Sequence, residues 1–375
     1  MHSIVKVSVR VLGVMADLIK HSGGQLLQQG LYGCIFAPAL KCANGVQPLK
    51  VVELDKTNPI LSKIISKDTA IIEYTIGQKI RRIPLWKNYY AVSESMCIPS
   101  AKQTDKDIKQ CEPIQGQKTS DLRILTMRYN GVSLNAIKLN LKTFDLIAFA
   151  THILEAGALM TLHGIVHRDL HSKNVIVDQY NVPRLIDFNL SILNYKNITA
   201  HSLSHSYSPT LFQLSPDYIL MNALDSRKPL LTSAKIMDDI IYKRSFTKTI
   251  SNILGISINT LHAQFKEFYN HSNAVRTRNM LEWFNEHWAV IDSWAIGSLV
   301  IYLITRFIHW PVFAPVLQAA KPTLFPVLRS LLSFNPLTRL DCIQALYHLN
   351  PHNKIVERFG KNWIAEKGAG ELFRF

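Results

Sequence analysis

The stretch GIVHRDLHSKNVIV, from Gly164 to Val177, places several polar side chains between two apolar runs. Asp169 and Asn174 lie five positions apart in it, and a further carboxylate, Asp187, follows downstream. Polar clusters in ordinary loops are commonly solvated and need no function. The spacing of these residues must therefore decide between a solvated loop and a functional site.

Flanking patterns predict how this polar stretch is positioned. Residues 144–162 carry apolar side chains at helical intervals, which is typical of a buried amphipathic helix. After the polar stretch, residues 174–177 and 182–188 read as two short strands around the turn DQYN. We expect the polar side chains to lie on a loop between a helix and a hairpin.

The spacing matches a known catalytic pattern twice. The residues HRDLHSKN at 167–174 fit H-R-D-L-x-x-x-N, and Asp187-Phe188-Asn189 stands at the offset of D-F-G. The chain therefore resembles a eukaryotic-type protein kinase, most closely the serine/threonine kinases of large cytoplasmic DNA viruses. Those kinases share a glycine loop that runs on to a cysteine, as GLYGCIFAPALKC does at 30–42. The resemblance covers about residues 26–347.

This resemblance implies an α+β, bilobal kinase-like fold with a small β-rich lobe and a larger helical lobe. The hydrophobic patterns agree, since the chain is β-rich up to about Arg128 and mostly helical after Tyr218. The predicted divisions are an N-terminal extension at 1–25, an N-lobe at 26–128, a C-lobe at 129–350 with a helical insertion at about 218–288, and a C-terminal tail at 351–375.

Catalytic roles follow from the resemblance residue by residue. Asp169 would accept or orient the proton of a substrate hydroxyl, while Asn174 and Asp187 would bind Mg²⁺ against the phosphates of ATP. We expect Asp169 and Asp187 to face one another across the nucleotide. His171 stands where most serine/threonine kinases have a lysine that touches the transferred phosphate, and it is charged only part of the time near neutral pH.

The phosphate-binding lysine has two candidates. Lys63 lies in the strand-like LSKII, ten residues before Glu73 on a predicted helix, and Glu73 would be its partner. Lys50, in PLKVV, is the alternative because it is closer to the glycine loop. We favour Lys63.

The glycine loop and the strand before the predicted hinge would bind the nucleotide. Glycines let the backbone approach phosphates, although Gln28 replaces the first glycine of the pattern. The residues expected to bind ATP are Gly30, Leu31, Tyr32, Gly33, Ile35, Lys63, Met127, Arg128, Tyr129, Asn130 and Ile176.

Sequence motifs further along the chain favour a protein substrate. Ser215-Pro216-Asp217 stands where A-P-E closes the activation segment, and Asp217 would pair with Arg339. Asp292 would hold the backbone of the catalytic loop. Asn189 replaces the glycine of D-F-G and belongs to the residue types that tolerate a left-handed backbone. Hydroxyls that, once phosphorylated, would meet Arg168 are Thr199, Ser202, Ser204, Ser206, Tyr207, Ser208 and Thr210.

Other functions stay open at this point. Small-molecule phosphotransferases of the aminoglycoside-kinase type also use D-x-H-x-x-N, which Asp169, His171 and Asn174 satisfy. A catalytically silent kinase fold that serves as a virion component is a third reading. The insertion at 218–288 either docks a protein partner or covers the lobe with helices.

Five cysteines without a C-x-x-C pair argue against a disulfide framework or a zinc ribbon, and favour buried thiols in a reducing compartment. A metal site formed by Cys34, Cys42, Cys97 and Cys111 is the alternative. We expect the protein in the host cytoplasm or packaged in the virion.

The net charge of +15 suits acidic partners, such as an acidic or virion-associated protein substrate, but no recognisable nucleic-acid module accompanies it. Charged residues interrupt every candidate transmembrane stretch, and residues 1–25 lack the features of a secretory signal. We read residues 1–25 as an amphipathic extension that packs on the body, and the oligomeric state is left open.

Overall fold

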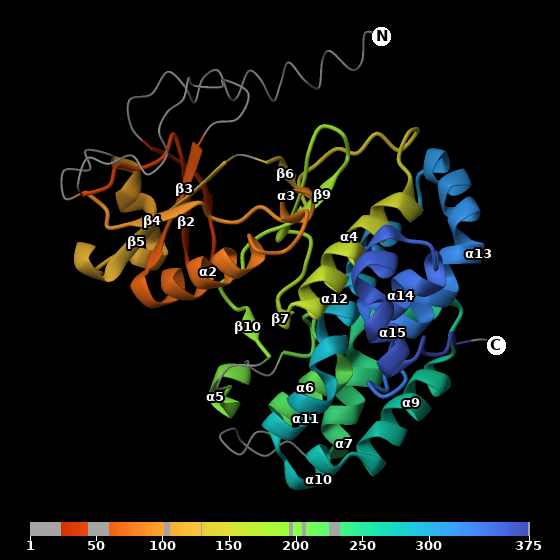
Figure 1. Cartoon of the computed structure of the whole chain (residues 1–375). Coiled ribbons are helices and arrows are strands. Elements are labelled where there is room, and N and C mark those ends of the chain that lie inside the picture. The colour runs from red at the N-terminus through yellow and green to blue at the C-terminus, as the bar shows by residue number, and fades with distance from the viewer. Residues whose placement is uncertain are drawn as a thin grey trace. The chain divides into compact units, whose positions relative to one another are not determined.

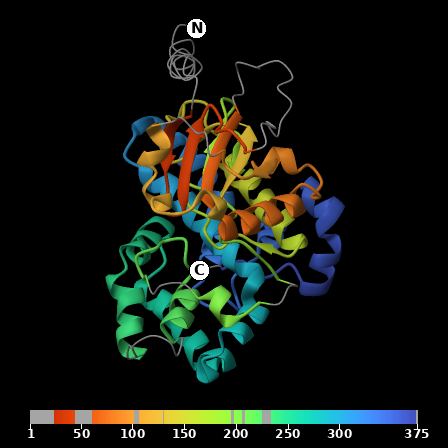
Figure 2. The same cartoon turned by 90° about the vertical axis from the view of Figure 1, so that its left-hand side faces the viewer.

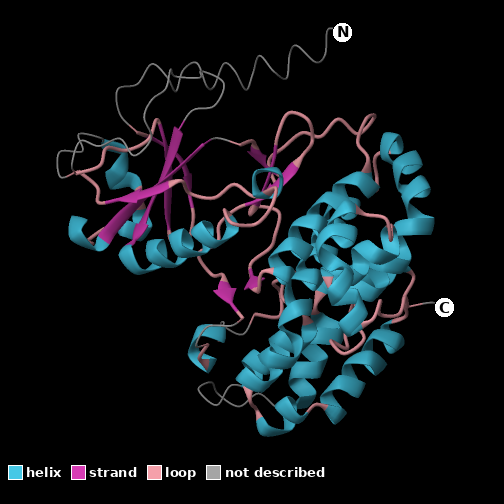
Figure 3. Ribbon diagram, in the orientation of Figure 1, coloured by secondary structure: helices cyan, strands magenta, loops and turns pink. Residues whose placement is uncertain are grey.

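The computed structural model describes residues 24–43, 60–100, 106–128, 130–194, 198–204, 208–224 and 233–373. The chain divides into two compact units (Figure 1). Described residues of the first, the sheet unit, lie within 24–87, 91–131 and 187–189, and those of the second, the helical unit, within 88–90, 132–186 and 190–373. Most strand residues belong to the sheet unit, whereas the helical unit is built mainly from helices (Figure 3).

An antiparallel sheet forms the body of the sheet unit (Figure 2). Its order in the described part of the chain is β1-β2-β3-β5-β4. The strands are β1 (Gln25–Gln29), β2 (Gly33–Ala37), β3 (Ile60–Ser66), β4 (Ser95–Cys97) and β5 (Leu122–Arg128). In the register, Ile35 lies opposite Lys63, and Lys63 lies opposite Leu125, so Lys63 occupies the middle of the sheet.

Helix α2 (Lys67–Ile80) follows β3 directly and contacts β3, β4 and β5. Asp68 in the first turn and Lys79 in the last complement the helix dipole. The buried residues recur at helical spacing, and Glu73 is one of them, between Ala70 and Ile76. The sequence periodicity therefore places the Glu73 carboxylate on the face that packs against the sheet.

A compact segment covers the sheet near its first strands. It contains the short helices η1 (Lys106–Gln110), η2 (Glu112–Ile114) and η3 (Thr119–Asp121). Its apolar side chains join those of the strands in one buried cluster: Cys34, Phe36, Leu40, Ile64, Cys111, Ile114, Leu122 and Ile124.

The helical unit begins with a small sheet and a central helix. Strand β6 (Val132–Ser133) pairs with β8 (Val175–Val177), which pairs with β9 (Pro183–Leu185), and β7 (Ile165–Val166) pairs with β10 (Ile192–Leu193). In chain order, α4 (Leu146–Leu162) lies between β6 and β7. The Asp145 carboxylate caps its first turn by accepting from the amide of Ala148 at 2.9 Å. Sequence patterns predicted a helix before the loop at residues 167–174 and a hairpin after it, and both are present. This loop is called the catalytic-type loop below.

Most of the remaining chain is helical, including the described part of the predicted insertion. Two large aromatic side chains in this helical part, Trp283 and Trp294, are fully buried. The elements are α5 (Ala200–Leu203), α6 (Pro216–Leu224), α7 (Ser233–Asp238), η4 (Asp239–Lys243), α8 (Ser245–Leu254), α9 (Ile258–His271), α10 (Asn273–Thr277), α11 (Met280–His287), η5 (Trp288–Val290), α12 (Ile291–Phe307), η6 (Pro311–Phe313), α13 (Ala314–Leu331), α14 (Cys342–Leu349), η7 (Val356–Gly360) and α15 (Lys361–Lys367), with the short α3 (Trp86–Tyr89) earlier in the chain.

Among the described residues, the continuous stretch Met280–Phe307 is long and apolar enough to cross a membrane by length and composition. Most of it is buried inside the protein, and the core helix of a folded domain meets the same two criteria. The stretch is therefore weak evidence for a membrane span.

Several sequence predictions fall on residues outside the described ranges: the N-terminal extension up to residue 23, Lys50, Tyr129, the candidate hydroxyls of Ser206 and Tyr207, residues 225–232 of the insertion and residues 374–375 of the tail. The predicted division into domains stays a prediction. The observed fold class is α+β, as predicted.

Candidate active site

Lys63 is the centre of a buried ion cluster in the sheet unit. Its ammonium Nζ lies 2.7 Å from Glu73 Oε2 and 2.8 Å from Asp187 Oδ1. Lys63 and Glu73 are almost entirely buried, whereas the Asp187 side chain is 30% exposed. Burial disfavours the charged ammonium, but the two carboxylates outweigh it, so the pKa of Lys63 is raised above its ordinary value. Lys63 therefore stays cationic beside the expected metal ligand Asp187.

The backbone at Asp187 is left-handed, with a φ of 64°. This differs from the expectation for Asn189, which is not among the described residues with positive φ. Asn189 instead has a buried side-chain oxygen without a hydrogen-bond partner. Because a left-handed backbone is costly for a residue other than glycine, its occurrence at Asp187 marks a position that the surrounding structure enforces.

The glycine loop is the turn of the β1–β2 hairpin. The Gly30 amide donates to the Gly33 carbonyl at 2.8 Å, and Leu31 at its tip is 80% exposed. Gly33 has a packing reason beyond phosphate approach, since a Cβ there would lie 2.1 Å from the Ile64 carbonyl oxygen. A Cβ on Gly30 would meet only ordinary contacts. Close packing against β3 therefore requires a glycine at position 33 but not at position 30.

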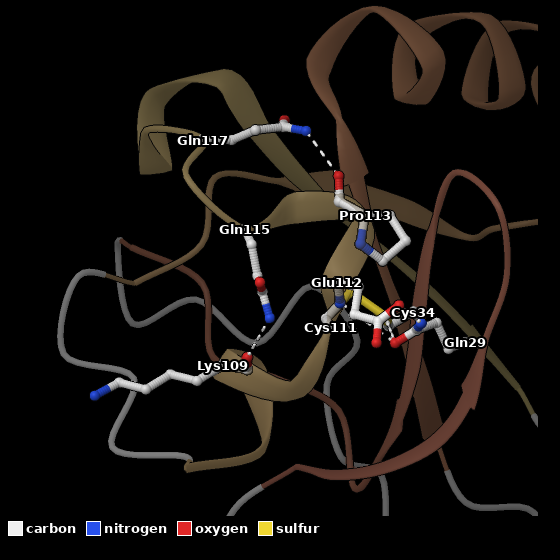
Figure 4. Close-up of a disulfide and its surroundings, with 8 residues drawn as sticks. All are labelled: Gln29, Cys34, Lys109, Cys111, Glu112, Pro113, Gln115 and Gln117. Atoms are coloured by element: carbon white, nitrogen blue, oxygen red, sulfur yellow. Dashed lines mark hydrogen bonds between the residues drawn. A yellow bond between two sulfur atoms is a disulfide. The ribbon is translucent and has the colours of Figure 1, made fainter.

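A disulfide joins this hairpin to the η1–η2 segment (Figure 4). Cys34, directly after Gly33, is bonded to Cys111, and on the neighbouring strand the Gln29 amide donates to the Glu112 carboxylate at 2.9 Å. The Glu112 amide donates back to the Gln29 side-chain oxygen at 3.3 Å. Both strands at the base of the glycine loop are thus attached to one segment.

The prediction of buried thiols is wrong for four of the five cysteines. Besides Cys34–Cys111, a second disulfide joins Cys42 to Cys97, and Cys342 is a free buried thiol. The metal alternative is also wrong for these four, since their sulfurs are bonded in pairs and no metal-type cluster of His, Cys, Asp and Glu occurs among the described residues. Sparse cysteines without short spacing did not reveal pairs separated by 77 and 55 residues.

The expected hinge lies at the end of β5. Arg128 forms an ion pair with Glu94 at 3.2 Å, and its carbonyl accepts a bond from the Asn130 side chain at 2.8 Å. This carbonyl therefore already accepts one bond within the protein. Met127 is half-buried, and the position of Ile176 is on β8 in the helical unit.

Asp169 lies on the catalytic-type loop of the helical unit, where polar groups hold both carboxylate oxygens. Oδ2 accepts from Asn174 Nδ2 at 3.1 Å and lies 3.6 Å from His171 Nε2, while Oδ1 accepts from Gln213 Nε2 at 3.1 Å. Burial alone would raise the pKa of Asp169, but His171, His167 and Gln213 outweigh it and lower the pKa below its ordinary value. Asp169 is therefore a carboxylate at neutral pH.

The backbone of this loop is held from α12. The Asp292 carboxylate accepts from the amides of His167 at 2.6 Å and Arg168 at 2.9 Å, as expected from the sequence. The His167 ring makes a further bond with the Ile186 carbonyl at 2.9 Å. These bonds support Arg168 in a left-handed backbone with a φ of 70°.

The Arg168 guanidinium already has several partners. It donates to the Tyr218 hydroxyl at 2.8 and 3.1 Å and to the carbonyls of Leu190, Ser202 and Leu203 at 2.8 to 3.3 Å. The expected contact with a phosphorylated hydroxyl would have to displace some of these bonds. The arginine therefore orders the segment after β10 through backbone oxygens.

Arg339 and Asp217 form a fully buried pair, with Nη2 2.6 Å from Oδ1. Trp283 of α11 donates to the other carboxylate oxygen at 3.1 Å. Burial alone would raise the pKa of Asp217, but Arg339 outweighs it and holds the pKa below its ordinary value. The pairing expected from the sequence is present, and Trp283 is a partner that the sequence did not reveal.

The ligand types present fit Mg²⁺ and a nucleotide. Asp187 offers carboxylate oxygens, and Asn174 donates to Asp169 through Nδ2, so its amide oxygen takes no part in those two bonds. The Asp169 and Asp187 carboxylates belong to different units, so the expectation that they face one another stays a prediction.

Comparison with known families finds a similarity over the part of the chain that carries several of these residues. The family model for protein tyrosine and serine/threonine kinases matches residues 100–223, which include Asp169, Asn174, Asp187 and Asp217. The observed α+β architecture, a small antiparallel-sheet region followed by a larger helical region, is consistent with a kinase fold.

A curated protein supports the same class. The chain is 28% identical over 85 residues to Cold-responsive protein kinase 1 of Arabidopsis thaliana. This match covers 23% of the chain and 21% of the plant protein, so it spans about a fifth of the relative's length. Both similarities support a eukaryotic-type protein kinase.

Proposed function

We propose that this chain is an ATP-dependent serine/threonine protein kinase that transfers the γ-phosphate of ATP to protein hydroxyls. The observation that carries the proposal is the bridging position of Lys63 Nζ, 2.7 Å from Glu73 and 2.8 Å from Asp187. Phosphoryl transfer needs positioned charges on the phosphates more than covalent chemistry. A lysine oriented by a buried glutamate supplies such a charge.

The remaining groups have complementary roles in this proposal. Asp187 and the Asn174 amide oxygen would hold Mg²⁺, which neutralises charge on the phosphates when bound. Asp169 is ionised and held through both oxygens, so it can accept or orient the proton of a substrate hydroxyl. His171, 3.6 Å from Asp169, would act on the transferred phosphate where most such kinases have lysine.

The finer classification rests on the sequence resemblance. The loop GLYGCIFAPALKC supports a kinase of the type found in large cytoplasmic DNA viruses, and the net charge of +15 favours acidic or virion-associated protein substrates. Serine/threonine preference is likewise part of the proposal, since the matching family includes tyrosine kinases.

A location in the host cytoplasm or the virion is also a proposal. Because disulfides persist mainly in oxidising surroundings, the pairs Cys34–Cys111 and Cys42–Cys97 remove the sequence argument for a reducing compartment. Fractionation of infected or expressing cells, with thiols alkylated at lysis, tests both points. Oxidised protein in the cytoplasmic or virion fraction supports the location, whereas protein confined to a secretory fraction contradicts it.

Transfer of labelled phosphate from ATP tests the activity. Purified protein with Mg²⁺ is incubated with mixed histones, which are basic, or casein, which is acidic, beside the variants Asp169→Asn and Lys63→Met. We expect wild type to label protein, casein more strongly, and both variants to lose about 100-fold or more of the rate. Lys50→Met is the matched control and should retain activity.

Each contrary outcome is specific. Equal labelling by wild type and both variants contradicts the proposal, and loss of transfer only in Lys50→Met contradicts the assignment of Lys63. Phosphorylation of an aminoglycoside but of no protein would make the chain a small-molecule phosphotransferase.

A further inference from the structure

Residues Leu211–Leu214 form a tight turn that a buried arginine holds. The Leu214 amide donates to the Leu211 carbonyl at 3.2 Å. Arg244, the residue before α8, donates through Nη2 to the carbonyls of Leu211 and Leu214 at 2.8 Å and of Phe212 at 3.3 Å. Trp294 of α12 adds a bond to the Phe212 carbonyl at 3.0 Å. Three of the four carbonyls of the turn therefore accept bonds from the side chains of Arg244 and Trp294.

Arg244 is a costly residue for simple packing. It is 3% exposed, burial lowers its pKa to about 9, and its Nε and Nη1 have no hydrogen-bond partner. The rings of Phe246 and Trp294 lie 5.6 and 5.7 Å from the guanidinium carbon, but no carboxylate pairs with it among the described residues. A buried charge without an acidic partner is expensive, and an apolar side chain would fill the same space at lower cost. The hydrogen bonds from Arg244 to the turn carbonyls are what an apolar side chain at this position would not provide.

The turn carries a residue that touches the catalytic-type carboxylate. Gln213 lies between the held carbonyls of Phe212 and Leu214, and its amide donates to Asp169 Oδ1 at 3.1 Å. Asn174 binds the other oxygen, so Asp169 is fixed from two sides. A displaced turn would remove one of these two supports.

We propose that Arg244 is a positioning residue for phosphoryl transfer, which fixes the turn Leu211–Leu214 so that Gln213 orients the Asp169 carboxylate. This inference rests on the proposed function. Arg244 belongs to the insertion at 218–288, for which the sequence left open docking or covering roles. In this account the insertion also contributes to the chemistry of the lobe that it covers.

A double-mutant cycle tests the proposal. The variants Gln213→Ala, Arg244→Met and their combination are compared with wild type for kcat and for KM of ATP, with casein as substrate. We expect each single variant to lose about tenfold in kcat at unchanged KM for ATP, because a misoriented base slows chemistry rather than nucleotide binding. The double variant should lose no more than the worse single variant, since Arg244 acts through Gln213.

Two further variants separate positioning from stability. Arg244→Lys keeps a cation that can donate to carbonyls and should recover part of kcat. Arg329→Met is the matched control, because Arg329 also donates to a carbonyl of the insertion, that of Leu254 at 2.9 Å, and its loss should leave kcat within about twofold. Thermal unfolding of every variant confirms that folded protein is assayed.

Several results would overturn the inference. They are an unchanged kcat in Gln213→Ala, kcat losses that multiply in the double variant, or a loss in Arg329→Met equal to that in Arg244→Met. If Arg244→Met does not fold, Gln213→Ala and its combination with Arg244→Lys decide in the same way. Failure of the proposed function is distinct, because wild type itself would then transfer no phosphate.

Discussion

The sheet unit and the helical unit keep their functional side chains in place by different means. In the sheet unit, a small apolar cluster is reinforced by the disulfides Cys34–Cys111 and Cys42–Cys97. In the helical unit, buried polar contacts such as Arg339–Asp217 lie within a large aromatic and aliphatic core. Small units bury a smaller share of their surface, so covalent links stabilise them most.

This difference has a consequence for the chemistry. In the sheet unit, the glycine loop and Lys63 lie on a sheet that two disulfides cross-link. Such a rigid support would suit the binding of ATP in the proposed function. The helical unit holds the Asp169 carboxylate through hydrogen bonds from Asn174 and Gln213, which would orient it for the role in the proposed reaction. Variants that weaken one kind of support should therefore affect one function more than the other.

The largest expected effect is in the helical unit, where Arg339→Met leaves Asp217 buried and unpaired. We expect a loss of about 3–5 kcal/mol in the free energy of unfolding, measured in urea at pH 7. The double variant with Asp217→Asn, which removes the charge, should recover part of it. An Arg339→Met protein as stable as wild type would show that the pair contributes nothing.

The same pair predicts a dependence on pH. In wild type the lowered pKa of Asp217 contributes stability that is present above about pH 4 and is lost as the pH falls through the folded pKa. In Arg339→Met burial is no longer outweighed, so the pKa rises and acid relieves the unpaired charge. The stability deficit of the variant should be smaller at pH 5 than at pH 7, and an equal deficit at both would contradict this reading.

The next effect is in the sheet unit. Replacing Cys34 and Cys111 by alanine should cost about 2–4 kcal/mol in the free energy of unfolding and weaken ATP binding, because the base of the glycine loop loses its anchor. Cys342→Ala is the control, since it removes a buried free thiol. Wild type and Cys342→Ala should lose stability in reductant, and the Cys34/Cys111 variant should lose less. If reductant leaves the free energy of unfolding of wild type unchanged, the disulfides do not stabilise the protein.

A smaller effect separates the two glycines of the loop. Gly33→Ala should cost about 1–3 kcal/mol, because its Cβ would overlap the Ile64 carbonyl of the neighbouring strand. Gly30→Ala should change the melting temperature little, since the space there is open. Similar melting temperatures for both variants would mean that β2 moves away from β3 at little cost.

The family resemblance assigned the site residues, and local sequence patterns supported those that lie close together in the chain. Asp169 and Asn174 share one loop, and Lys63 and Glu73 lie on adjacent elements whose periodicity fixes their facing sides. Asp292 and Arg339 were predictable only through the family resemblance, because their partners are more than 100 residues away.

The missed features all depend on tertiary contacts that no short pattern encodes. Gln213 contacts Asp169 across 44 residues, and the partners of Arg244 are backbone oxygens, which any sequence offers. The disulfide partners are brought together by strand pairing and by the segment that covers the sheet. The left-handed residue is Asp187 rather than Asn189, and because Asp and Asn both tolerate that backbone, residue type alone could not tell the two positions apart.

The most direct test asks whether ATP binding depends on the sheet unit and phosphate transfer also on Asp169 of the helical unit. ATP affinity in Mg²⁺, by calorimetry, and the rate of phosphate transfer to casein are measured on the same preparations of Asp169→Asn and Lys63→Met. We expect Asp169→Asn to bind ATP within about threefold of wild type yet to transfer phosphate at least 100-fold more slowly, whereas Lys63→Met should lose both ATP binding and transfer. Full transfer by Asp169→Asn, or unchanged ATP binding and transfer in Lys63→Met, would contradict it.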